Sequence, residues 1–208
     1  MLWKSEPPRI LVGLGNPGKE YARTRHNLGA TAVRDYAERA GLVFKTDRTF
    51  GVAVAKGKCA GGKLAHLVLP TGYMNESGRP IAAYLNYYEW GPEQLLIAVD
   101  DVAIPFTELR LRVSGSAGGH NGLKSIQECL GTEQYARLRM GVGDREHGTL
   151  SDHVLGVFSA EEMQELPALL ERSKQIIDCW LDQGLPAAMR ISGKKPQQST
   201  QEEKDDAR

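Results

Sequence analysis

Hydrophobic residues recur along the chain in two patterns, which together predict β-strands that alternate with α-helices. Short apolar runs predict strands over residues 9–14, 50–55, 64–69, 95–99, 109–113 and 136–142. Apolar residues at helical spacing predict helices over residues 27–40, 76–88, 123–130 and 159–183. This alternation is typical of the α/β class, and we predict a single three-layer α/β/α domain with a twisted, mostly parallel mixed sheet.

The ends of the chain differ in pattern from its middle. Residues 9–192 carry the periodic pattern and are expected to form the folded domain, preceded by an N-terminal extension over residues 1–8. Residues 193–208 are polar, charged and without periodicity, so we predict a disordered tail there. A chain of 208 residues can form one sizeable hydrophobic core, and nothing in the pattern suggests a second.

Charge and cysteine usage narrow the classes of partner. The 26 basic residues balance 26 acidic ones, so a polyanion such as RNA would have to bind a local basic patch. Cys59, Cys129 and Cys179 form no C-x-x-C pair, which argues against a disulfide framework and against structural zinc. No apolar run reaches the length of a signal peptide or a membrane span. We therefore expect a soluble cytoplasmic protein with no membrane partner.

Two histidines near the C-terminal third offer little as metal ligands. His147 and His153 are separated by loop residues and have no ligand-type partner beside them. Both are predicted to be solvated, and no metal site is expected.

A glycine loop follows the first predicted strand and matches the dinucleotide-binding pattern G-x-G-x-x-G over Gly13–Gly18. That pattern also requires a helix that starts within the glycines and an acidic residue at the end of the next strand. The predicted helix begins later, Glu38 lies inside it, and Asp47 is too far along the chain. A dinucleotide-dependent oxidoreductase is therefore the least supported function, and no cofactor is expected.

Polar residues follow several of the predicted strands. Asn16, Asn75 and Asp100 follow the predicted strands 9–14, 64–69 and 95–99, and His120 and Asn121 lie in a glycine loop before a helix. Because ligands bind outside the carboxyl ends of strands in open α/β sheets, we expect these residues to share one rim. A histidine beside an aspartate is the minimal pair for general-base chemistry, and asparagines add neutral donors and acceptors. His120 is interpreted as a brace for its loop.

Four separated motifs resemble those of bacterial peptidyl-tRNA hydrolases: Gly13–Gly18 with Tyr21, Thr24–Asn27, Pro70–Gly78 and Gly118–Leu123. The similarity extends from about residue 10 to residue 187. The resemblance implies hydrolysis of the ester that joins a peptide to the 3′ ribose of tRNA, which recycles tRNA from stalled translation. It also implies an enzyme that needs no metal or cofactor and usually acts as a monomer.

The resemblance also implies roles for individual residues. His26 matches the base that activates water, and Asp100 matches the acid paired with it. Asn16 and Asn75 match residues that position the substrate and His26, and Asn121 matches one that holds the water or the substrate carbonyl. His26, Asp100 and Asn16 are thus the predicted catalytic residues.

Further matches concern contacts with peptidyl-tRNA, its acceptor stem and its 3′ end. Tyr21 matches a residue that stacks against the 3′ end, and Met74 matches one that lines the peptide groove. Arg112 and Arg139 match two basic residues that grip the 5′ phosphate. A local basic face on a neutral protein would then comprise Arg110, Arg112, Lys124, Arg137 and Arg139.

The chain departs from the family pattern at Gly72, Val99, Ala103 and Asp144, none of which removes a predicted catalytic group. Simpler interpretations remain: Met74 would also suit the core, and Arg112 would also suit a solvated strand face. A non-catalytic RNA-binding protein on the same fold is the alternative function.

Overall fold

Strand β1 (Arg9–Gly13) lies at the centre of a seven-stranded sheet with the order β2-β3-β4-β1-β5-β7-β6. The computed structural model describes residues 8–144 and 148–193. The other strands are β2 (Lys45–Asp47), β3 (Val52–Lys58), β4 (Leu64–Pro70), β5 (Leu95–Asp101), β6 (Leu109–Arg112) and β7 (Ala136–Gly141). The helices are α1 (Leu28–Arg39), α2 (Gly78–Tyr87), α3 (Asn121–Leu130), α4 (Leu150–Leu155), α5 (Ala160–Gln183) and α6 (Leu185–Ser192).

The sheet is mixed, with a parallel centre. Strand β1 pairs in parallel with β4 and β5, and β5 pairs in parallel with β7. The outer pairs β2–β3, β3–β4 and β6–β7 are antiparallel. Because the parallel strands end at the same edge, the loops that follow them meet there, as the sequence predicts.

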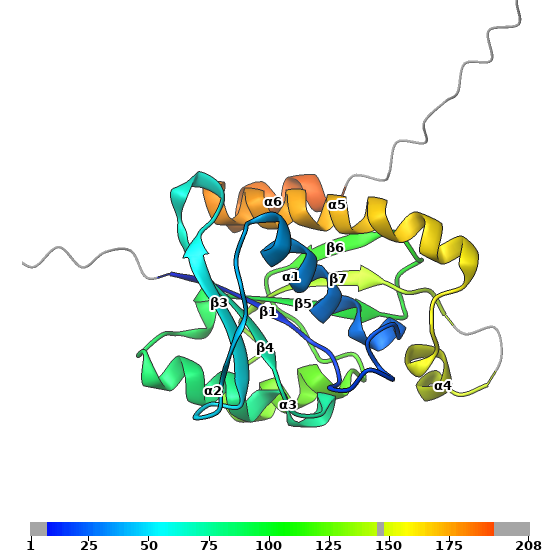
Figure 1. Cartoon of the computed structure of the whole chain (residues 1–208), viewed down its shortest axis with the longest axis horizontal. Helices are drawn as coiled ribbons and strands as arrows, with labels where there is room; N and C mark the ends of the chain where they lie inside the picture. Colours follow the sequence, from blue (N-terminus) through cyan, green and yellow to red (C-terminus); the bar gives the residue numbers. More distant parts are fainter. Residues whose placement is uncertain (1–7, 145–147, 194–208) are drawn as a thin grey trace, which may run out of the picture.

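Successive side chains of the central strands point to opposite faces of the sheet, and a separate hydrophobic core lies on each face. Leu11 and Leu96 pack with α1 and α5 on one face, whereas Val12 and Ile97 pack with α2 and α3 on the other. Figure 1 shows these layers, with α5 and α6 along one side of the sheet and α2 and α3 along the opposite side. The predicted three-layer α/β/α domain is confirmed.

Three short elements were absent from the sequence-based prediction. Strand β2 consists of polar residues and exists through its pairing with β3. Helix α4 is a short helix whose Thr149–Asp152 capping box supplies its start. Helix α6 begins directly after Gly184, where α5 ends.

Other predictions have different outcomes. The long helix after Ser159 is confirmed with its Glu162 capping box. The predicted extension, apart from Pro8, and the predicted tail beyond Gly193 lie outside the described residues, as does His147. Among the helices of the described ranges, none combines the length and the apolarity that a membrane crossing requires.

Helix α1 approaches β5 so closely that only glycine fits at one position. A Cβ on Gly29 would lie 2.2 Å from the carbonyl oxygen of Ala98. Backbone hydrogen bonds fix the same contact, since Leu14 N–H donates to Ala98 O at 3.1 Å and Ala30 N–H donates to Leu14 O at 2.8 Å. The start of α1, and with it His26 in the turn directly before the helix, is therefore held at the carboxyl end of β5.

A buried histidine lies at the opposite end of β4 from that edge. His66 Nδ1 lies 2.8 Å from the hydroxyl of Tyr84, and the rings of Tyr88 and Trp90 surround it. Burial, and then the positive charge of Lys56 opposite it on β3, lower the pKa of His66 to about 4. The folded state therefore favours the neutral imidazole.

We expect His66 to make stability depend on pH. Because its pKa is lower in the folded than in the unfolded chain, its contribution is complete above about pH 6.5 and is lost as the pH falls toward 4. In His66→Gln, the free energy of unfolding, measured by urea titration, should fall less steeply across this range, by up to about 1.4 kcal/mol per pH unit. Equal slopes in the two proteins would contradict this account.

Candidate active site

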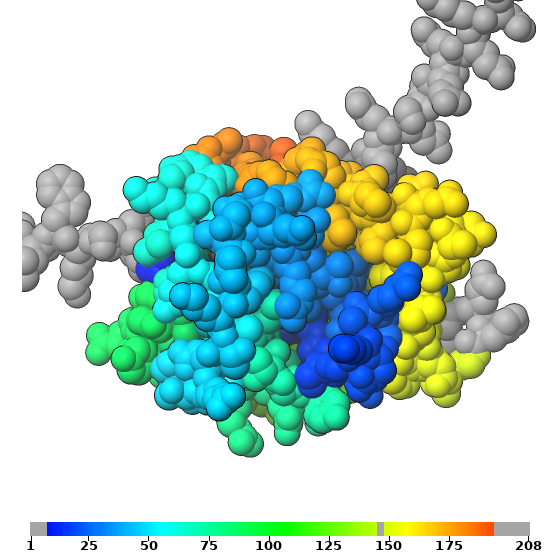
Figure 2. Space-filling view, in the orientation of Figure 1, coloured from blue at the N-terminus to red at the C-terminus, as the bar shows by residue number. Residues whose placement is uncertain are grey.

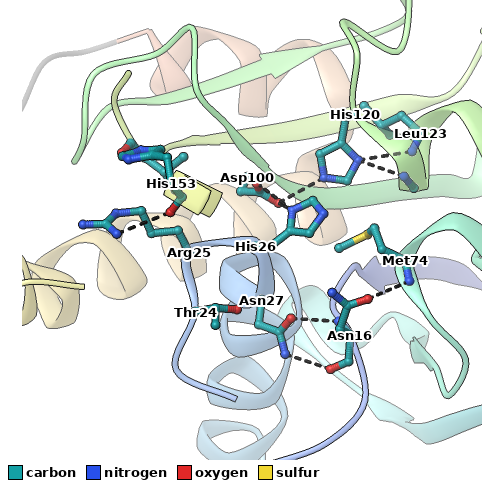
Figure 3. A network of polar contacts seen from close by, with 12 residues as sticks. Asn16, Thr24, Arg25, His26, Asn27, Met74, Asp100, His120, Leu123 and His153 are labelled. Atoms are coloured by element: carbon teal, nitrogen blue, oxygen red, sulfur yellow. Dashed lines mark hydrogen bonds and ion pairs between the residues drawn. The ribbon is translucent and has the colours of Figure 1, made fainter. Parts of the chain in front are cut away.

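Three side chains from three different segments meet at the carboxyl end of the sheet (Figure 3). Asp100 comes from β5, His26 from the 3₁₀ turn Arg25–Asn27 before α1, and His120 from the loop before α3. His26 Nδ1 lies 3.1 Å from Oδ1 and 3.0 Å from Oδ2 of Asp100. His120 Nε2 lies 3.0 Å from Oδ1 of the same carboxylate. The Asp100 side chain is only 1% exposed.

The hydrogen bonds of His120 fix its tautomer. Its Nδ1 accepts from the backbone N–H of Gly122 at 3.1 Å and of Leu123 at 3.3 Å, which caps α3. An accepting Nδ1 carries no proton, so the proton of neutral His120 is assigned to Nε2, which donates to Asp100. His26 Nδ1 donates to the same carboxylate, which leaves His26 Nε2 with a lone pair.

Asp100 is held as a carboxylate. Burial alone would raise the pKa of Asp100, but the imidazoles of His120 and His26 lower that pKa well below its usual range. A buried carboxylate that accepts two N–H groups is stabilised in its charged form. Asp100 therefore serves as a fixed hydrogen-bond acceptor for both histidines.

The same three residues form the one group within the described ranges that could hold a metal ion, with ligand atoms within 4.8 Å of one another. A ligating nitrogen must offer a lone pair. His120 Nε2 is assigned a proton, and its Nδ1 lone pair is used by the backbone of α3. The donor set thus suits a proton-transfer network better than a metal centre.

A second set of contacts is built from amides. Asn16 Oδ1 accepts from the backbone N–H of Met74 at 2.8 Å. Asn27 Oδ1 accepts from Asn16 N–H at 2.8 Å, and Asn27 Nδ2 donates to Asn16 O at 2.9 Å. Asn27 is buried, so these bonds fix the β1–α1 loop against the turn that carries His26. Asn16 Nδ2 is left for a ligand.

A cavity of about 580 Å³ opens above these residues. It brings together most of the predicted site residues, namely Asn16, His26, Met74, Asn75, Asp100, Asn121 and Arg139. Apolar residues of α4, Leu150 and Leu155 among them, line another wall. Amide donors, an unprotonated imidazole nitrogen and an apolar wall together suit the hydrolysis of a substrate with a carbonyl group and an apolar portion.

Two predicted residues lie away from this cavity. Tyr21 is half-buried, and its carbonyl oxygen accepts from Thr24 N–H at 3.0 Å. Arg112 is exposed on β6 beside a separate depression of about 180 Å³. The structure therefore does not bring Arg112 and Arg139 to one cavity.

The predicted basic face is smaller than the sequence indicates. Arg137 is buried, and its Nη1 donates to Ser116 O at 2.7 Å, so its assignment to the surface was wrong. Arg110 forms an ion pair with Glu108 at 3.0 Å. Arg139 forms an ion pair with Asp101.

The comparisons with known proteins agree with this geometry. The family model described as peptidyl-tRNA hydrolase matches residues 10–201. The chain belongs to the peptidyl-tRNA hydrolase family.

Individual relatives support this membership across nearly the whole chain. The peptidyl-tRNA hydrolase of Gloeobacter violaceus is 45% identical over 184 residues, covering 88% of this chain and 92% of that protein. That of Chloroflexus aggregans is 45% identical over 183 residues, covering 86% and 96%. The crystal structure of peptidyl-tRNA hydrolase from Acinetobacter baumannii has a TM-score of 0.85 at 35% identity, covering 93% of this chain and all of that one.

Several features of this family member were missed from the sequence. His120 was interpreted only as a loop brace, yet it also contacts Asp100. Asn27 stands in the quoted Thr24–Asn27 motif but was given no role. His153 was predicted to be solvated, which was wrong, because its Nε2 lies 3.1 Å from Val142 O and 3.0 Å from Gly143 O.

The glycine loop does not form a dinucleotide cradle. Helix α1 begins only at Leu28, well after Gly18, so no helix N-terminus points at the glycines. The loop instead presents Asn16 to the cavity.

We expect Asn27 to stabilise the loop through its two amide bonds. Asn27→Leu would leave two backbone groups of Asn16 without partners and should lower the free energy of unfolding by about 1–3 kcal/mol. Urea unfolding measures the change. Asn86→Leu, at an exposed position on α2, is the control and should change stability by no more than about 0.5 kcal/mol. Equal losses in both variants would refute the role of Asn27.

Proposed function

We propose that this chain hydrolyses the ester between a peptide and the 3′ ribose of tRNA, with His26 as the general base. Family membership supports the reaction, and the contact of His26 Nδ1 with Asp100 supports the residue assignment. That contact leaves His26 Nε2 as the proton acceptor in a cavity that His26 lines. This arrangement is the single observation on which the assignment rests.

In the proposed mechanism, His26 Nε2 takes a proton from a water molecule as the water oxygen attacks the ester carbonyl. Asp100 stabilises the imidazolium that forms, and His120 holds Asp100 in place. Amide N–H groups of Asn16 and Asn121 stabilise the negative oxygen of the tetrahedral intermediate. The intermediate then breaks its bond to the ribose 3′ oxygen, which takes the proton from His26.

The peptide and the tRNA would use different walls of the site. Met74 and the apolar residues of α4 would contact the peptide, and Asn75 would help to position the ester. Tyr21 would stack against the 3′ end of the tRNA, and Arg112 and Arg139 would contact the acceptor stem. The proposal includes action as a monomer in the cytoplasm.

We expect His26→Ala to abolish most of the hydrolysis while tRNA binding survives. General-base catalysis typically contributes about 100-fold to 10,000-fold, so release of peptide from N-blocked aminoacyl-tRNA should fall by that factor. His66→Gln, which lies outside the cavity, should keep full activity at pH 7.5. Full activity in His26→Ala would overturn the mechanism. A wild-type chain that binds tRNA without hydrolysing it would support the RNA-binding alternative.

We expect Arg112 and Arg139 to contribute to tRNA binding through a 5′ phosphate. Arg112→Ala and Arg139→Ala should each weaken binding to 5′-phosphorylated tRNA and reduce its salt slope by about one. Asp101→Asn removes the charge that pairs with Arg139 but keeps the oxygen that accepts from Ala103 N–H, so it should tighten binding at low salt. Transcripts with a 5′ hydroxyl are the control. An unchanged salt slope would count against these contacts.

A further inference from the structure

Arg25 precedes His26, yet its side chain extends away from His26 toward a distant part of the chain (Figure 3). It contacts residues 153–162, which we call the anchor segment. Its Nη1 donates to Val157 O at 2.9 Å, and its backbone N–H donates to Gly156 O at 3.0 Å. Figure 2 shows the same proximity, with the dark-blue residues of this loop packed against the yellow residues around α4.

A charge pair completes this attachment. Arg25 Nη2 lies 2.5 Å from Oε2 of Glu162, and the two side chains are 13% and 20% exposed. The Arg25 guanidinium also lies 5.4 Å from the ring centroid of Phe158, which is buried. Arg25 Nε also donates to Oε1 of Glu162 at 3.4 Å, and a partly desolvated arginine with two contacts to one carboxylate holds its position more firmly than an exposed ion pair.

The turn that carries His26 has few hydrogen bonds of its own. It is a 3₁₀ helix limited to Arg25–Asn27, and no side chain caps its start at Thr24. Such turns have poorer hydrogen-bond geometry than α-helices. Thr24 is buried and forms an isolated antiparallel bridge with Val157 in the anchor segment. The start of the turn therefore depends on contacts outside itself.

We propose that Arg25 is a positioning residue, which keeps the ring of His26 aligned with Asp100 by fastening the turn to the anchor segment. This inference rests on the proposed function of His26. Asn27 and Gly29 fix the C-terminal side of the turn, and Arg25 fixes the N-terminal side. The anchor segment also includes Val154 and Leu155, which line the cavity, so Arg25 joins the base to one wall of the substrate site.

The test compares Arg25→Gln, Arg25→Lys and Glu162→Gln with a matched control. Glutamine at position 162 suits a helix capping box, so Glu162→Gln removes the charge while retaining the start of α5. The control, Arg39→Gln, breaks the 2.5 Å ion pair of Arg39 with Glu171, which also joins α1 to α5. The melting temperature of each variant, measured by thermal unfolding, shows whether it is folded at the temperature of the assay.

We expect kcat for peptidyl-tRNA hydrolysis to fall about 10-fold to 100-fold in Arg25→Gln, with KM within about twofold of wild type, because a small misplacement of a reacting group is costly. Glu162→Gln and Arg25→Lys should lower kcat by smaller factors. The double variant Arg25→Gln/Glu162→Gln should lower kcat by no more than Arg25→Gln alone, because both changes remove the same contact. Arg39→Gln should retain kcat. A kcat within twofold of wild type in Arg25→Gln, a change in KM alone, or additive losses would overturn the proposal.

A measurement without substrate separates this proposal from the proposed function. In ¹⁵N-histidine-labelled protein, the ring N–H protons of His26 and His120 that face Asp100 should exchange slowly with solvent, with His26→Gln assigning the signals. Arg25→Gln should accelerate exchange of the His26 proton by at least about 10-fold and leave that of His120 unchanged. Unchanged exchange at His26 would overturn the positioning role. An inactive wild-type enzyme with the expected exchange pattern would instead reject the proposed function.

Discussion

The rest of the site depends on one buried carboxylate. Asp100 is nearly inaccessible to solvent, and a charged group in such a place is stable only when hydrogen-bond donors surround it. Two imidazoles from separate segments meet that requirement. The requirement in turn fixes the loop before α3 and the turn before α1 relative to the end of β5.

The two imidazoles differ in whether their second ring nitrogen is available, although both donate to the same carboxylate. His120 uses its second nitrogen to cap α3, so neither nitrogen is available to a reactant. His26 uses one nitrogen for Asp100 and presents the other to the cavity. Environment thus leaves one histidine with both nitrogens occupied and the other with a free lone pair, in the same way that it distinguishes paired carboxylates in other enzymes.

Much of the fold could be predicted from the sequence because the strands of the parallel centre, such as β5, are continuous apolar runs. The residues that form β2 carry no apolar signal, since that strand exists through pairing with a distant segment. Arg137 shows the same limit: its charge indicated a surface position, whereas the Ser116 carbonyl that accepts from its buried guanidinium belongs to a distant segment. The motifs indicated His26 and Asp100, whereas the tautomer of His120 depends on backbone N–H groups that only the folded loop orients.

The contact at Gly29 has a consequence for how this protein tolerates change. Main-chain atoms of α1 and β5 touch directly at this glycine, so the backbone itself sets the spacing between the start of α1 and the end of β5. Repacking of side chains elsewhere in the two cores can therefore alter stability while leaving that spacing nearly constant. A substitution in the core therefore acts first on stability, whereas one at position 29 would act directly on the spacing between the start of α1 and the end of β5.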